Sequence, residues 1–76
     1  MPSDKNLDQV EMGGEAVIES VSGPRAFVRR LLSLGVAPGT SLKVVRRAPL
    51  GDPLQVQIGK LNLSIRRNEA RNVLIR

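Results

Sequence analysis

The chain of 76 residues contains no cysteine and no histidine. It therefore lacks a thiolate nucleophile, an imidazole base and the usual ligands of a zinc site. No disulfide can supplement its hydrophobic core either. We expect a protein that is not an enzyme, with no catalytic residue, no cofactor and no metal site.

Carboxylates are the only remaining side chains that could bind a hard metal ion. The candidates lie near the N-terminus at spacings of three to four residues: Asp4, Asp8, Glu11, Glu15 and Glu19. This segment has the pattern of a loop followed by a strand, so the spacing does not place them on one helix face. We interpret them as a solvated acidic edge, with a metal site as the less favoured alternative.

Aromatic residues and long hydrophobic runs are also scarce. Phe27 is the only aromatic residue, whereas sequence-tolerant binding of single-stranded nucleic acid uses several aromatic stacking platforms. The longest apolar runs are short pieces such as Val73–Ile75, far below the length that spans a bilayer. Residues 1–12 lack the apolar core of a secretory signal. We expect a cytoplasmic protein that does not insert into membranes.

The net charge of +5 is unevenly distributed. Residues 1–19 carry five carboxylates and one lysine, whereas the rest of the chain carries eleven basic residues against Asp52 and Glu69. A basic surface of this kind favours an acidic partner. The alternative is that the charge only keeps a small domain soluble.

The hydrophobic pattern predicts a mainly β domain with one helix. Strands are expected at Glu15–Val21, 41–48, Leu54–Ile58 and Leu61–Ile65, with a helical turn at 67–71 and a short strand at 72–75. The helix is expected over 24–34, with Pro24 in its first turn and Gly35 directly after its end. Phe27, Leu31 and Leu34 form its predicted core stripe, and Arg25 and Arg29 lie on the opposite face.

Short strands joined by tight turns, with one helix after the first strand, predict a small SH3-like β-barrel of about five strands. Residues 1–6 are expected to be a flexible N-terminus, and residues 7–76 to form a single domain. An SH3-like shape does not bring SH3-like binding with it.

The loop between the second and third strands is the most informative segment for function. Leu50 lies between turn-forming residues, where a large aliphatic side chain has little structural purpose. We therefore predict a partner-binding surface at the tip Leu50, Gly51, Asp52 and Pro53, with Arg46 and Arg47 beside it. The exposed helix arginines, Arg25 and Arg29, are further candidates for contact.

Several segments together resemble the FeoA family, over about residues 7 to 75. They are Leu7, Val10 and Gly13, then RRLLSLG at 29–35 followed by Pro38-Gly39, the tip PLGDP at 49–53, and IRRNEA at 65–70. The resemblance implies a small cytosolic accessory protein of bacterial ferrous-iron uptake, with a family label of transition-metal binding. The implied partner is the cytosolic GTP-binding domain of the FeoB membrane transporter.

Two other functions stay open on the residues alone. A basic nucleic-acid-binding barrel would suit the charge, although the shortage of aromatic residues makes nucleic acid an unexpected partner. A detached regulatory domain related to those of metal-dependent repressors would suit the fold, but no helix-turn-helix segment is present. The sequence does not decide the oligomeric state.

Overall fold

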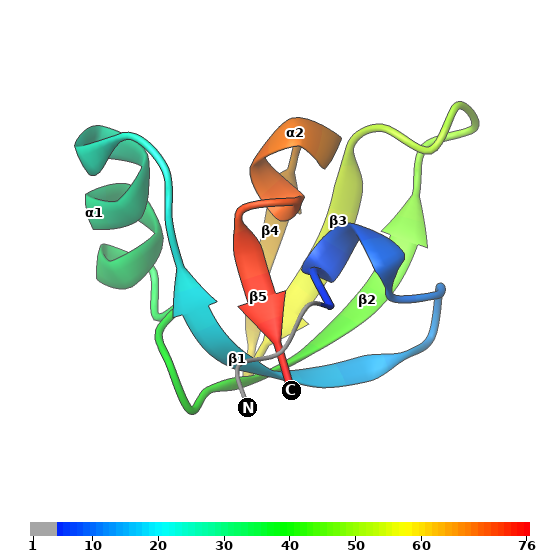
Figure 1. Ribbon diagram of the computed structural model, residues 1–76. Coiled ribbons are helices and arrows are strands. Elements are labelled where there is room, and N and C mark those ends of the chain that lie inside the picture. Colours follow the sequence, from blue (N-terminus) through cyan, green and yellow to red (C-terminus); the bar gives the residue numbers. More distant parts are fainter. Residues whose placement is uncertain (1–4) are drawn as a thin grey trace.

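The computed structural model describes residues 5–76 (Figure 1). A short 3-10 helix precedes the first strand, the main helix follows that strand, and a single helical turn precedes the last strand. In chain order the elements are η1 (Leu7–Gln9), β1 (Glu15–Val21), α1 (Arg25–Ser33), β2 (Ser41–Arg47), β3 (Leu54–Ile58), β4 (Leu61–Ile65), α2 (Arg67–Ala70) and β5 (Val73–Ile75). The predicted mainly β class with one main helix is confirmed.

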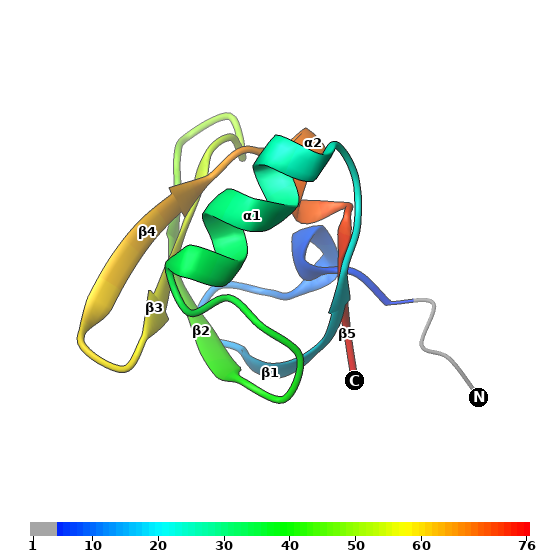
Figure 2. The ribbon, with the colours of Figure 1, turned by 90° about the vertical axis from the view of Figure 1, so that its left-hand side faces the viewer.

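The five strands form one antiparallel sheet in the order β4-β3-β2-β1-β5. The sheet bends around a common core, but β4 and β5 do not pair with each other, so hydrogen bonding does not close the barrel. This differs from the closed sheet expected from the strand pattern. The helix α1 lies in front of the sheet, between β4 on one side and β5 on the other (Figure 2).

The core consists of aliphatic side chains from alternating strand positions. In β3, Leu54 and Val56 are fully buried while Gln55 between them is exposed. This alternation follows from the two-residue period of a strand. The other large, fully buried side chains are Leu7, Ile18, Leu31, Ile65, Val36, Val44 and Val73.

The helix α1 contributes less to this core than its pattern predicts. Leu31 is buried, but Phe27 is only partly buried against the core and Leu34 is 37% exposed. The prediction that all three are core residues is therefore wrong for Leu34 and holds only in part for Phe27. The physical reason is that a three-turn helix at the open side of a small sheet has neighbours beneath only a narrow stripe. The Arg30 guanidinium covers the Phe27 ring at 5.9 Å from its centroid.

The N-terminal segment joins the sheet earlier than expected. The Lys5 carbonyl accepts a 2.9 Å hydrogen bond from the Ile75 amide, and Asn6 forms a bridge with Leu74. Residues 5 and 6 are thus attached to β5 rather than being part of a flexible end. Residues 1–4 of the predicted flexible segment lie outside the described residues.

Asp8 in η1 holds three distant parts of the fold together. Its carboxylate lies 3.2 Å from both Arg47 Nη1 and Arg67 Nε and 3.6 Å from Arg71 Nε. The Arg47 guanidinium also donates hydrogen bonds to the carbonyls of Asp8 and Val10. The Asp8 side chain is only 10% exposed. η1, the end of β2 and α2 are therefore fixed against one another by one part-buried carboxylate.

The environment of Asp8 lowers its pKa. Burial raises the pKa, but hydrogen bonds from Arg67 and Arg47, with their positive charges, outweigh that effect. Asp8 consequently binds a proton less readily in the folded state than in the unfolded chain. Its contribution to stability is complete above the usual carboxyl pKa and is lost as the pH falls through the lowered value.

Within residues 5–76, none of the helices combines the length and the apolar character that crossing a bilayer demands.

We predict that Leu31→Ala destabilises the domain by about 2–5 kcal/mol, because it leaves a cavity in the aliphatic core. Phe27→Ala should cost less, about 1–2 kcal/mol, since only part of the ring is removed from water. Urea denaturation followed by circular dichroism measures both values. A larger loss for Phe27→Ala than for Leu31→Ala would contradict the placement of α1.

We predict that Asp8→Asn lowers the free energy of unfolding by about 1.5–3 kcal/mol at pH 7, because charge-assisted hydrogen bonds from Arg47 and Arg67 are lost. The difference from the parent protein should shrink as the pH falls below about 4, where Asp8 of the unfolded chain binds a proton, and should disappear once the pH passes the lowered pKa of the folded state. Thermal melts between pH 2 and 7 measure it, with Glu11→Gln, a change at an exposed carboxylate, as the control. A difference that does not depend on pH would refute the role of the Asp8 charge.

Candidate docking site

The loop between β2 and β3 forms a protruding tip. The Ala48 amide donates to the Pro53 carbonyl at 3.0 Å, and the Gly51 amide donates to the Ala48 carbonyl at 2.7 Å. Gly51 has a φ of +83°, a conformation that favours glycine. This tight turn leaves Leu50 90% exposed. The structure therefore presents Leu50 to solvent rather than folding it back onto the sheet.

The base of the tip is tied to the body of the domain. Asp52 Oδ1 accepts a 3.0 Å hydrogen bond from the Arg67 amide at the start of α2. The Gly51 carbonyl accepts a 3.4 Å hydrogen bond from Arg47 Nη1, the same nitrogen that contacts Asp8. Gly51 and Asp52 thus position the tip, and Leu50 and Pro53 are the tip residues with side chains left for contact. A loop held in this way loses little entropy when a partner binds.

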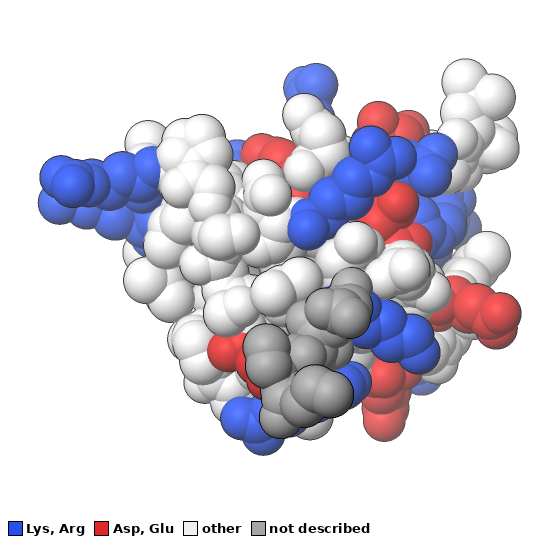
Figure 3. Space-filling view, in the orientation of Figure 1, with Lys and Arg blue, Asp and Glu red and all other residues white. Residues whose placement is uncertain are grey.

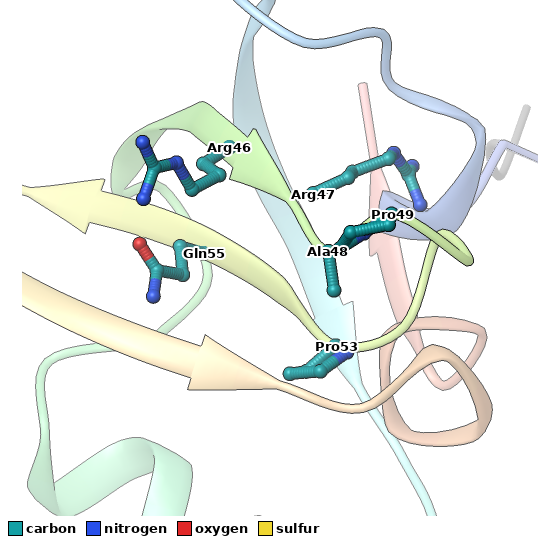
Figure 4. Close-up of a pocket in the computed structure, with 6 residues that line it drawn as sticks. All are labelled: Arg46, Arg47, Ala48, Pro49, Pro53 and Gln55. Carbon is teal, nitrogen blue, oxygen red and sulfur yellow. The ribbon is translucent and has the colours of Figure 1, made fainter.

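Arg46 and Arg47 lie on opposite sides of β2. Figure 4 shows Arg46 beside Gln55, whereas Arg47 points the other way, toward η1. Arg46 is exposed, but the Arg47 side chain is only 20% exposed and is paired with Asp8. The expectation that both arginines are available to a partner is therefore corrected for Arg47. Its guanidinium is already occupied within the chain.

A hollow of about 470 Å³ opens at the foot of the tip. Its lining combines aliphatic side chains with the exposed Arg46 cation, and this combination can accept an apolar side chain next to a carboxylate. The lining residues are Arg46, Arg47, Ala48, Pro49, Pro53 and Gln55 (Figure 4).

The α1 arginines form a second, separate basic surface. Arg25 and Arg29 are exposed, and Figure 3 shows basic side chains projecting from the α1 side of the molecule. In Figure 1 the tip, at the upper right, and α1, at the left, lie at opposite ends of the molecule. The structure therefore does not bring Arg25 and Arg29 together with Arg46 and Leu50.

Among the acidic N-terminal residues, Glu11 and Glu15 are exposed, as expected of a solvated edge, but Asp8 is not. Asp8 is part-buried and paired with arginines, and Asp4 lies outside the described residues. In the described part of the chain, no three aspartate or glutamate side chains gather as a metal site would require. The role of Asp8 could not be found from the sequence, because its partners Arg47 and Arg67 lie 39 and 59 residues away.

Comparison with known proteins identifies the family of the chain. The FeoA domain model matches residues 5–76. An Fe(2+) transport protein A/Fe(2+) transporter FeoB fusion protein of Porphyromonas gingivalis is 37% identical over 67 residues. That match covers 88% of this chain but only 8% of the fusion protein.

Solved structures share the fold. A FeoA protein of Chlorobium tepidum is 41% identical, with a TM-score of 0.89 over 93% of this chain and 68% of that one. The FeoA of Stenotrophomonas maltophilia, a zinc complex described as a prokaryotic SH3 domain protein, is 33% identical with a TM-score of 0.83. The match covers 95% of this chain and 89% of the Stenotrophomonas maltophilia chain.

A manganese-dependent transcriptional repressor also has this fold over 42% of its length, with a TM-score of 0.85 and 17% identity. That similarity concerns the fold alone. The predicted SH3-like architecture is confirmed, and the family model that spans residues 5–76 shows that the chain belongs to the FeoA domain family.

Proposed function

We propose that this protein is a non-catalytic accessory factor of ferrous-iron uptake that works in the cytoplasm by docking onto the cytosolic GTP-binding domain of a FeoB-like transporter. The observation that carries this proposal is the Porphyromonas gingivalis relative, in which a FeoA-like segment and FeoB are parts of one chain. Domains joined in one protein commonly act on each other, because the linkage raises their effective concentration. The Stenotrophomonas maltophilia relative is itself discussed as a ferrous iron transport activating factor.

The tip is the proposed contact surface. Leu50 offers an apolar side chain at 90% exposure on a loop that is tied to β2 and α2. Arg46 is exposed and lines the hollow at the foot of the tip. An exposed aliphatic anchor next to an arginine suits a partner surface with a small apolar hollow and a carboxylate at its rim. Arg25 and Arg29 on α1 would add long-range attraction to an acidic partner rather than contacts at the tip.

Docking through the tip is tested by exchanging its residues singly. Leu50→Ala and Arg46→Ser should leave the melting temperature nearly unchanged, because both side chains are exposed. Each should weaken binding to the transporter's purified cytosolic domain at least about tenfold, or ~1.4 kcal/mol. Only Arg46→Ser should also flatten the salt dependence of the affinity. Isothermal titration calorimetry at two salt concentrations measures these effects.

Two further variants serve as controls for the tip. Met12→Ala removes another apolar side chain, 62% exposed, that lies outside the tip, and its binding should match the parent protein. Arg47→Ser should lower the melting temperature, since Arg47 is bound to Asp8. Equal binding by the Leu50→Ala and Met12→Ala proteins would exclude the tip as the contact surface.

A metal-carrier function is a distinct alternative that calorimetry can test. Without thiolate or imidazole ligands, we expect no stoichiometric Fe²⁺ site in the isolated domain, because carboxylates alone discriminate poorly among divalent ions. Anaerobic titration with Fe²⁺ should give no saturable heat at micromolar concentrations. A one-to-one site of micromolar affinity would replace the accessory proposal with a carrier.

A further inference from the structure

The two edges of the sheet differ in whether another segment of the chain pairs with them. The outer edge of β5 is covered, because Asn6 forms a bridge with Leu74 and the Lys5 carbonyl accepts a hydrogen bond from Ile75. The other edge is β4, which among the described residues pairs only with β3. One edge of the sheet is therefore closed by the chain itself and the other is open.

The hydrogen bonds and register of β2, β3 and β4 determine which N–H and C=O groups of β4 point away from the sheet. The Ala48 amide bonds to the Pro53 carbonyl, so Pro53 faces β2 and the next residue, Leu54, faces β4. In an antiparallel ladder this alternation continues along each strand. The two-residue turn Gly59-Lys60 leads to the same assignment. The residues that flank such a turn, here Ile58 and Leu61, form hydrogen bonds with each other.

The regular register of β3 and β4 then assigns the β4 residues. Leu61, Leu63 and Ile65 direct their N–H and C=O groups toward β3. Asn62 and Ser64 direct theirs away from the sheet. The open edge therefore presents two donors and two acceptors in a row.

The open edge lacks the features that usually protect an edge strand. Natural edges carry a charge, a proline or a bulge that prevents pairing with another strand. β4 reads Leu-Asn-Leu-Ser-Ile, pairs with β3 over all five residues without a register shift, and has none of these. Leu61 is 41% exposed on it. Such an edge is suited to accept a further strand.

There is also room beside the far end of β4. A hollow of about 480 Å³ lies where this strand approaches α1 and α2. Its lining residues are Arg30, Asp52, Pro53, Ser64, Arg66 and Glu69. The carboxylates in it are already engaged, Asp52 by the Arg67 amide and Glu69 by Arg30.

The positive charges at the two ends of β4 favour the addition of an acidic strand. Lys60 and Arg66 lie immediately before and after β4, and neither side chain has an ion pair among the described residues. If two copies paired antiparallel through all of β4, Lys60 of one would lie opposite Arg66 of the other at both ends. Like charges directly opposite each other destabilise a sheet. The edge is therefore poorly suited to a second copy and complementary to an acidic strand.

We propose that the β4 edge binds an extended acidic segment of a partner protein by strand addition. The segment has apolar residues opposite Leu61 and Leu63, where they extend the partly buried face of the sheet, and acidic residues opposite Lys60 and Arg66. Its main chain pairs with Asn62 and Ser64. This surface is separate from the tip, so the proposal does not depend on docking through Leu50.

The test uses a heptapeptide with blocked ends, Glu-Val-Thr-Val-Thr-Val-Glu, added to the intact ¹⁵N-labelled protein. Saturating peptide should slow amide hydrogen exchange at Asn62 and Ser64 at least about tenfold, because both donors become paired. The Leu63 amide, already bonded to β3, should change little. The same peptide with lysine at both ends should bind at least about tenfold more weakly at low salt.

Matched controls separate strand addition from simple charge attraction. Methylating the two threonine nitrogens keeps the charge but removes the donors opposite β4, and should abolish binding. The double change Lys60→Ser, Arg66→Ser should weaken binding of the acidic peptide, whereas Arg25→Ser, Arg29→Ser, which removes the same charge from α1, should not.

Three results would overturn the proposal. The first is the absence of any amide shift on β4 at millimolar peptide. The second is equal binding by the N-methylated peptide. The third is slow exchange at Asn62 and Ser64 that grows with protein concentration in the absence of peptide, which would mean that a second copy covers the edge.

Discussion

The carboxylate of Asp8 is the point at which separate parts of the chain meet. It accepts hydrogen bonds from Arg47 at the end of β2 and from Arg67 in α2, and its own helical turn η1 packs Leu7 into the core. Burying a carboxylate is costly unless it is paired. The pairing requires both arginines to stay in place, so one charge fixes the relative position of the N-terminal turn, the tip and α2.

This arrangement also determines which positive charges remain available to a partner. Arg47 and Arg67 are engaged by Asp8, and Arg30 by Glu69. The exposed cations that have no ion pair within residues 5–76 include Arg25, Arg29, Arg46 and Arg66. They lie on different parts of the surface rather than in one patch. The strongly basic composition is therefore spread over several small basic surfaces, each with its own neighbours.

Small size explains much of the remaining architecture. A core without aromatic residues other than Phe27 must draw on nearly every strand, and a short helix can cover only part of the open side of the sheet. Leu31 alone of the α1 residues is buried. The chain closes the β5 edge with residues 5 and 6, and β4 keeps an edge to which another strand could be added.

Local pattern was sufficient for most of the fold. Alternation and turn residues predicted β1, β3 and β4 with their observed bounds, and Pro24 and Gly35 marked the ends of α1, because these signals depend on neighbours within a few residues. The exposure of Leu50 was predicted for the same reason, since two prolines and a glycine surround it.

What the sequence could not provide is the pairing of residues that are distant along the chain. Nothing local distinguishes Arg47, which is bound to Asp8, from Arg46, which is exposed beside it. Strand order decides that one faces η1 and the other faces solvent. The same holds for Asp52, whose bond to α2 exists only in the folded chain. Alternation along a strand determines which residues share a face, whereas tertiary structure alone determines what that face meets.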